Sequence, residues 1–308
     1  MAVVLAWFVF IKPYQLLLTR YPANVIRVRV MTLRECLYNY RFSWLMTLIL
    51  VSCLYSGIII DMAADWYRDE NYSHGFLVPF IAGYFVYERW DYLKSCQISS
   101  SAAGLVVIVF ALMQLIIGSI GLEYFTIRSS LVVLIAGMVL FFWGTELFRA
   151  VRLPVLYLLL MVPLPYIFYN ALAFPLKQFV SWISVGCMKL IGVTVVRDGN
   201  IIMFPGISLE VADACSGMRS LVSILVLSIA YAFFLQLSHL KRWIVILSSV
   251  LIAIATNALR VIITGILASY HGAAAAQGFF HEFAGMAVFA LAMALLGVVG
   301  LALRGRTA

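Results

Sequence analysis

The chain has 308 residues, of which 65% are hydrophobic and only 11% are charged, and its mean hydropathy is +1.05. A soluble domain has about half apolar and about a quarter charged residues, so this composition excludes a soluble globular protein and indicates a chain that crosses a membrane several times. The formal net charge of +8 reflects basic cytoplasmic loops rather than a nucleic-acid surface, and we expect no nucleic-acid partner.

Residues 1–41 form a basic segment ahead of the first long apolar run. Its first eleven residues are apolar but too short to span a bilayer, so we expect this segment to lie in the cytoplasm or at the membrane interface. They lack the charged start and small-residue cleavage site of a signal peptide. The sequence leaves open that translation begins at Met31.

Eight segments between residues 42 and 303 approach the 20 or so apolar residues that a transmembrane helix needs. The second and fifth are short and contain Pro79, Pro163 and Pro165, so we expect these two to be kinked or bounded by proline. Residues 304–308 would form a short cytoplasmic tail. The eight predicted spans are 42–60, 73–87, 102–120, 129–147, 153–168, 216–237, 243–263 and 283–303.

The longest connection, residues 169–214, separates the fifth and sixth predicted spans. Its first half, 172–191, mixes apolar and polar residues in a pattern typical of an amphipathic interfacial helix. Asp198-Gly199 between two β-rich runs predicts a hairpin, and Pro205-Gly206 predicts a second turn. The sequence thus predicts an all-α polytopic membrane protein with about eight transmembrane helices and a small outer β-hairpin and amphipathic segment before the sixth.

Loop charges predict the orientation of the spans. Basic residues precede the first span and follow the second, fourth, sixth and eighth, which all fall on one side of the membrane. Acidic residues such as Asp61, Glu70 and Asp213 dominate the alternate connections. Because cytoplasmic loops retain Lys and Arg, we expect both termini in the cytoplasm and residues 169–214 outside.

Four reactive or titratable side chains then fall at the outer ends of four different spans. Cys215 lies at the start of the sixth, Arg260 near the end of the seventh, His281 at the start of the eighth, and His74 at the start of the second. A helix N-terminus and a nearby cation both lower a thiol pKa, and Arg219 stands one helical turn after Cys215.

The arginine and histidine side chains of this set are suited to assist a cysteine nucleophile. An arginine stabilises a thiolate or an oxyanion, and a histidine transfers protons near neutral pH. Asn257, one turn before Arg260, could orient it. No CxxC pair and no zinc spacing occurs among the five cysteines, so we expect neither a metal nor a cofactor nor a disulfide framework.

Each residue also has a plainer interpretation. Cysteine is common in membrane cores as a small hydrophobic residue, a role that suits Cys53 and Cys187. Boundary arginines such as Arg219 often extend to the phosphates of membrane lipids. Arg260 fits this less well, because an arginine inside an apolar run costs about 2.5 kcal/mol or more near the membrane centre.

Five segments resemble, in order and spacing, the motifs of the exosortase/archaeosortase family, over roughly residues 72–285. Three of them carry the residues just described, and two lie nearer the N-terminus. They are Ala214-Cys215-Ser216-Gly217-Met218-Arg219, Asn257-Ala258-Leu259-Arg260-Val261, His281-Glu282-Phe283-Ala284-Gly285, Tyr72-Ser73-His74-Gly75-Phe76-Leu77-Val78-Pro79, and Leu153-Pro154 with Pro163-Leu164-Pro165.

The resemblance implies an integral-membrane cysteine protease or transpeptidase that recognises C-terminal sorting signals of the PEP-CTERM type, each with a Pro-containing motif, a hydrophobic helix and a basic tail. It assigns Cys215 as nucleophile, Arg260 as electrostatic stabiliser and His281 as general acid and base. Arg219, Asn257, His74 and Ser216 would be supporting or substrate-proximal. The archaeal branch often has arginine at the position of His281, so the bacterial branch fits better.

The resemblance also implies a location and partners. We expect the bacterial cytoplasmic (inner) membrane, with the site facing the periplasm, and membrane-anchored proteins with sorting signals as substrates, in protein sorting linked to exopolysaccharide and cell-surface export. Some relatives carry an additional C-terminal domain that does not follow the eighth predicted span here, which leaves room for a separate periplasmic partner protein.

Two other classes of protein remain open from the sequence. One is a transporter or structural component of exopolysaccharide export, in which His74, Arg260 and His281 bind an anionic substrate. The few charges inside the other spans and the lack of paired broken helices argue against it. The other is an intramembrane serine protease that uses Ser216, which is disfavoured because Ser216 adjoins the better nucleophile Cys215.

Overall fold

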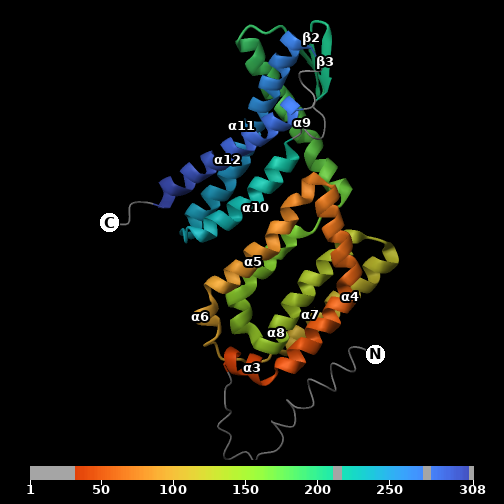
Figure 1. The fold of residues 1–308 in the computed structure, drawn as a ribbon, viewed down its shortest axis with the longest axis vertical. Coiled ribbons are helices and arrows are strands. Elements are labelled where there is room, and N and C mark those ends of the chain that lie inside the picture. Colours follow the sequence, from red (N-terminus) through yellow and green to blue (C-terminus); the bar gives the residue numbers. More distant parts are fainter. Residues whose placement is uncertain (1–31, 211–216, 273–278, 305–308) are drawn as a thin grey trace, which may run out of the picture. The chain divides into compact units, whose positions relative to one another are not determined.

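The computed structural model describes residues 32–210, 217–272 and 279–304, which are almost entirely helical apart from one small sheet (Figure 1). The chain divides into two compact units. The first comprises residues 1–62 and 82–159, and the second comprises residues 63–81 and 160–308. The candidate site residues whose side chains the structure describes, His74, Arg219, Asn257 and Arg260, belong to the second unit.

Helices build the first unit. Thr32 caps the first of them through a reciprocal pair of hydrogen bonds with Glu35, a local motif that fixes a helix start. The helices are α3 (Leu33–Asn39), most of α4 (Arg41–Arg68), most of α5 (Leu77–Glu88), α6 (Trp90–Leu93), α7 (Ala102–Gly121) and α8 (Tyr124–Tyr157).

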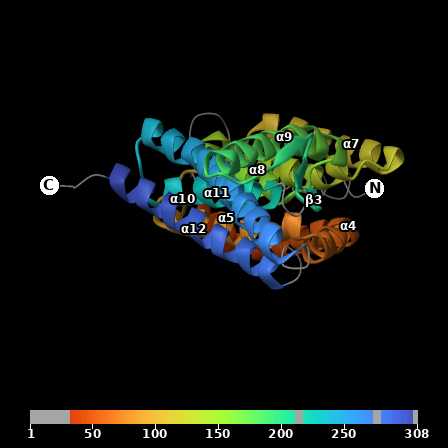
Figure 2. The same cartoon turned by 90° about the horizontal axis from the view of Figure 1, so that it is seen from above.

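Helices α7 and α8 lie side by side (Figures 1 and 2). Glycines allow this approach, since a Cβ at Gly104 would clash with the backbone of Phe141 and a Cβ at Gly137 would lie 2.9 Å from the backbone nitrogen of Ile108. Such small residues let helix backbones come close in a membrane, where packing rather than the hydrophobic effect drives helix association.

The helical run of α8 is broken at Gly144, whose φ of 89° and ψ of −176° are not helical. A Cβ at this position would clash with the carbonyl oxygen of Ser99. Two helices therefore meet here, and they correspond to the fourth and fifth predicted spans. The second of them contains Pro154 and ends in a short 3₁₀ helix, η3 (Leu158–Met161).

Six helical runs among the described residues are long and apolar enough to cross a membrane, which confirms an all-α polytopic membrane fold. Helices α5 and α10 are shorter, with 12 and 17 residues, so the count of eight crossings stays a prediction. Helix α9 is long and apolar enough to cross a membrane, so its expected position at the membrane interface also stays a prediction. The six runs are Arg41–Arg68, Ala102–Gly121, Tyr124–Met161, Tyr166–Leu190, His239–Tyr270 and Phe283–Arg304.

The second unit contains a 3₁₀ helix, four long helices and the sheet. Helices α10, α11 and α12 pack against one another around a core that includes Ile224, Val245 and Leu296. The elements are η2 (Glu70–Phe76), α9 (Tyr166–Leu190), β1 (Val196–Asp198), β2 (Ile201–Phe204), β3 (Ile207–Glu210), α10 (Met218–Phe234), α11 (His239–His271) and α12 (Phe279–Arg304).

The predicted hairpin is present, as part of a three-stranded antiparallel sheet in the order β1-β2-β3. Asp198 pairs with Ile201, so the tight turn consists of Gly199 and Asn200 rather than Asp198 and Gly199. Gly199 has a φ of 60°, as the first position of a type II′ turn requires. The predicted second turn at Pro205 and Gly206 joins β2 to β3.

The sheet packs against α9 and α11. Ile202 and Phe204 on β2 share a core with Met188 of α9 and with Ala258 and Val261 of α11. Ala258 and Val261 lie on either side of Arg260 in the motif 257–261. The sheet therefore packs against the segment of α11 that carries the Arg260 side chain.

Candidate functional site

The structure describes part of the predicted site. Cys215 and Ser216 lie outside the described residues. His281 is the third residue of α12, so it lies at the start of that helix, and its side chain is outside the described part. Arg219, Asn257, Arg260 and His74 are described, and all four lie in the second unit.

The start of α10 is docked on α11. Gly217, two residues after Cys215 in the sequence, precedes the helix in a left-handed conformation with a φ of 77°. Asn257 of α11 is 2% exposed and packs against it, since a Cβ at Gly217 would lie 2.6 Å from the amide of Asn257. The cysteine-containing motif therefore contacts the motif 257–261 through Gly217 and the buried amide of Asn257.

Arg260 lies on α11 one turn after Asn257 and is half-buried. Its guanidinium lies beside Gly285 of α12, where a Cβ would be 3.1 Å from an arginine nitrogen and 3.3 Å from Cζ. Gly285 belongs to the same motif as His281, four residues earlier. The motif 257–261 thus contacts the motif 281–285 through the guanidinium of Arg260 and the backbone at Gly285.

Arg219 lies in the first turn of α10 and forms an ion pair with Glu70 of η2. The pair joins the first motif to the segment that begins the motif 72–79. In the sequence Glu70 is one of several acidic loop residues, and nothing in its spacing from Arg219 indicates a contact.

A set of hydrogen bonds fixes η2 to the segment around Pro163-Leu164-Pro165. The indole of Trp66 donates to the carbonyl of Met161 at 2.8 Å, the hydroxyl of Tyr72 donates to the carbonyl of Leu164 at 3.2 Å, and the hydroxyl of Tyr169 donates to the side chain of Asn71 at 3.3 Å. The two N-terminal motifs of the resemblance are therefore in contact, which their sequence separation did not reveal.

His74 lies within η2 and is 6% exposed. The imidazole is therefore enclosed in the interior of the second unit. Its role beside a substrate stays a prediction.

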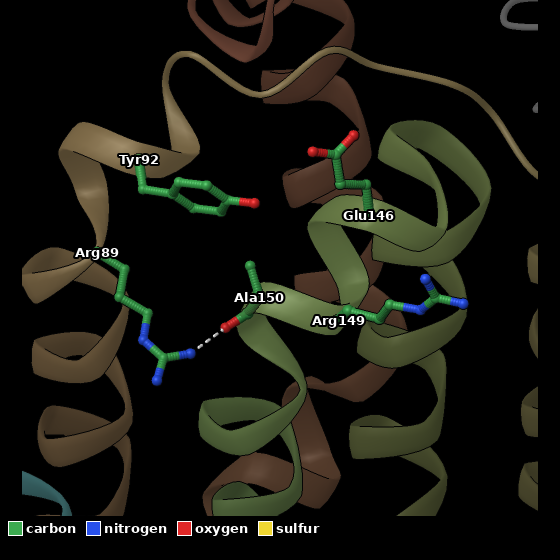
Figure 3. Close-up of a pocket in the computed structure, with 5 residues that line it drawn as sticks. All are labelled: Arg89, Tyr92, Glu146, Arg149 and Ala150. Atoms are coloured by element: carbon green, nitrogen blue, oxygen red, sulfur yellow. Dashed lines mark hydrogen bonds between the residues drawn. The ribbon is translucent and has the colours of Figure 1, made fainter. Parts of the chain in front are cut away.

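A separate pocket lies in the first unit, lined by Arg89, Tyr92, Glu146, Arg149 and Ala150 (Figure 3). Arg89 donates to the carbonyl of Ala150 at 2.6 Å, whereas the side chain of Arg149 points away from Arg89 (Figure 3). The two guanidinium groups do not converge on one point, and the pocket includes none of the predicted site residues. We assign it no function.

Within the described ranges, no group of three or more His, Cys, Asp or Glu side chains is placed to hold a metal ion. Arg219 and Arg260 give the described part of the site its permanent positive charge, and Arg260 lies one turn after the buried Asn257.

The sequence profile of the transmembrane exosortases (Exosortase_EpsH) matches residues 66–298. This chain belongs to the exosortase family. The match spans all five motifs as well as Trp66 and Glu70, and it includes the contacts that join η2, α10, α11 and α12. Neither a curated protein nor a solved structure matches the chain. Membership of this family supports a membrane exosortase-like protein, and the residues of the site are the candidates for its active groups.

Proposed function

We propose that this exosortase is a membrane cysteine protease or transpeptidase that cleaves C-terminal PEP-CTERM-type sorting signals at the outer face of a bacterial cytoplasmic membrane. The observation that carries the proposal is the pairwise meeting of three motifs. Gly217 lies against Asn257, and Arg260 lies against Gly285. Residues flanking a cysteine, an arginine and a histidine thus belong to one packed set of helices.

The nucleophile is Cys215, four residues before Arg219 and directly ahead of α10. A helix N-terminus carries a partial positive charge, and an arginine beside it adds a full one, so both stabilise a thiolate over a thiol. The same environment would do little for the hydroxyl of Ser216, whose pKa is far above neutrality.

In the proposed reaction the thiolate sulfur of Cys215 attacks the carbonyl carbon of the scissile peptide bond. The carbonyl oxygen takes the negative charge, which the guanidinium of Arg260 stabilises. The C–N bond then breaks, and His281 gives its proton to the departing amine. This leaves a thioester and a neutral His281. Water or an acceptor amine then attacks the thioester carbonyl and gives a proton to His281, the C–S bond breaks, and the product leaves with the thiolate and the protonated His281 restored.

The membrane arrangement belongs to the same proposal. The substrate's own hydrophobic helix lies in the bilayer and presents its Pro-containing motif at the outer surface. Both termini of this chain are cytoplasmic, which follows from the basic residues in alternate loops. Processing of this kind would serve the sorting of proteins during exopolysaccharide and cell-surface export, with the membrane-anchored protein as partner.

The test is a tagged reporter that ends in a Pro-Glu-Pro motif, an apolar helix and an Arg-rich tail, expressed with the full chain in a host that lacks its own exosortase. We expect Cys215→Ala and Cys215→Ser to leave the reporter at full length. Cys187→Ala, at an exposed cysteine of α9, is the matched control and should process it normally. Full processing by Cys215→Ala would overturn the proposal.

A second measurement separates the protease from a transporter. Cys53 and Cys187 are exposed free cysteines of α4 and α9, so they give the baseline rate of alkylation by a small membrane-permeant reagent at neutral pH. An activated Cys215 should react faster than both. A transporter gives no reason for this difference, and equal rates at the three cysteines would remove the chemical basis of the proposed nucleophile.

A further inference from the structure

The ion pair between Arg219 and Glu70 joins two elements and is open to solvent. The arginine side chain is 43% exposed and the glutamate side chain is 68% exposed. Exposed ion pairs contribute little to folding stability. The pair is therefore poorly suited to holding η2 against α10, and both charged groups can be reached from outside.

Other contacts already hold η2 in place. Asp69 caps it by accepting from the backbone N–H of Asn71 at 2.9 Å, and the hydroxyl of Ser73 donates to the carbonyl of Glu70 at 2.9 Å. Tyr72 within η2 donates to the carbonyl of Leu164, and Trp66, near the end of α4 just before η2, donates to the carbonyl of Met161. A carboxylate is thus presented to Arg219 from a fixed backbone.

The start of α10 favours a carboxylate. Its first turn contains Arg219 and no acidic residue, and the N-terminus of a helix is itself positive. Glu70 supplies the missing negative charge from another element. An arginine presents a planar fork that matches a carboxylate, so the carboxylate of a second chain could take the same place with the same hydrogen-bond geometry.

We propose that Arg219 is a specificity-determining residue that binds an acidic side chain of the substrate, and that Glu70 occupies Arg219 until the substrate's carboxylate replaces it. The inference rests on the proposed function, because it requires a peptide substrate. The exchange leaves no buried charge unpaired, since the exposed Glu70 side chain returns to water. Arg219 is four residues from Cys215, so the acidic residue of the substrate lies near the scissile bond.

The experiment uses three reporters that differ at one position, with Pro-Glu-Pro, Pro-Gln-Pro or Pro-Lys-Pro before the same apolar helix and basic tail. We expect the native chain to process the Glu reporter about tenfold faster than the Gln reporter, as loss of a charge-assisted hydrogen bond predicts. Arg219→Gln should abolish this preference, and Arg219→Glu should favour the Lys reporter. An Arg219→Gln variant that keeps the native preference would overturn the inference.

Glu70→Gln provides a second test that leaves Arg219 intact, and so remains informative if the Arg219 variants fail to fold. Without its carboxylate, Glu70 no longer competes with the substrate. We expect KM to fall for the Glu reporter and to stay unchanged for the Gln reporter, with kcat little altered. An equal change for both reporters would mean that Glu70 acts on the fold or on the thiol, and would count against the exchange.

Two controls and one baseline complete the design. Asp61→Asn and Lys189→Gln remove exposed charges from α4 and α9 and should leave the ratio of rates on the three reporters unchanged. If the native chain cleaves all three reporters at equal, Cys215-dependent rates, only the inference about Arg219 fails. If it cleaves none of them, the proposed function fails as well.

Discussion

The amide of Asn257 on α11 fills the space where a side chain at Gly217 would stand, because a Cβ there would lie 2.6 Å from the amide carbon and nitrogen. The position of Gly217 and of the start of α10 along α11 is therefore set by Asn257, one turn before Arg260. A glycine with a φ of 77° makes this approach possible.

Replacement of Gly217 by alanine should disturb this junction. The left-handed conformation costs about 1 to 2 kcal/mol for a residue with a Cβ, and the added methyl must also displace Asn257. We expect Gly217→Ala to slow reporter processing by about tenfold or more, as a shift of roughly 1 Å at a catalytic group does, and to lower the melting temperature in detergent.

Gly192→Ala is the matched control for this variant. Gly192 has a φ of 83° and no atom within 4 Å of a built Cβ, so it carries the backbone cost without the contact. It should lose stability and keep its processing rate. Equal loss of activity in the two variants would show that the contact with Asn257 does not matter for the site.

The sequence predicted the parts of this structure that depend on local patterns. Long apolar runs marked the helices, and the Gly and Pro residues at 199, 205 and 206 marked the two turns of the sheet. The bend at Gly144 was missed, because a glycine within an apolar run is common and only its contact with Ser99 shows why the backbone turns there.

The candidate site was predictable as a set of residues but not as a set of contacts. The positions of Arg260 and Arg219 stand out, since charges beside or inside apolar runs are costly. Their partners do not stand out. In the sequence Gly285 does not differ from the other glycines of its helix. Glu70 is one of several acidic loop residues, and its pairing with Arg219 depends on how η2 packs in three dimensions.

The acid dependence of stability should reveal the cap of α8. The carboxylate of Glu123 accepts from the backbone N–H groups of Phe125 and Thr126. Burial alone would raise the pKa of Glu123, but the hydrogen bonds from Thr126 and Phe125 outweigh it and place the pKa below its usual range. The cap therefore stabilises the protein above the unfolded pKa of about 4.3 and is lost as the pH falls through the folded value.

Glu123→Gln should lower the melting temperature in detergent at pH 7 by a few degrees, as loss of an N-cap of about 1 kcal/mol predicts. The difference from the native chain should shrink as the pH falls below about 4.3. A difference that stays constant from pH 7 down to pH 3 would rule out the carboxylate as its source.

The contact between Arg260 and Gly285 predicts how the proposed oxyanion stabiliser is held. Because a Cβ at position 285 would lie 3.1 Å from the guanidinium, a branched side chain there must push the arginine aside. We expect Gly285→Val to lower kcat for the reporter by about 100-fold, the effect of losing one oxyanion donor, with a smaller change in KM. Gly297→Val is the control on the same helix. No atom lies within 4 Å of a Cβ built at Gly297, so this variant should leave kcat and KM close to native.

Arg260→Lys should lower kcat as Gly285→Val does, since lysine keeps the charge and loses the planar fork of the guanidinium. Native turnover by Arg260→Lys would reduce Arg260 to a residue that binds lipid headgroups.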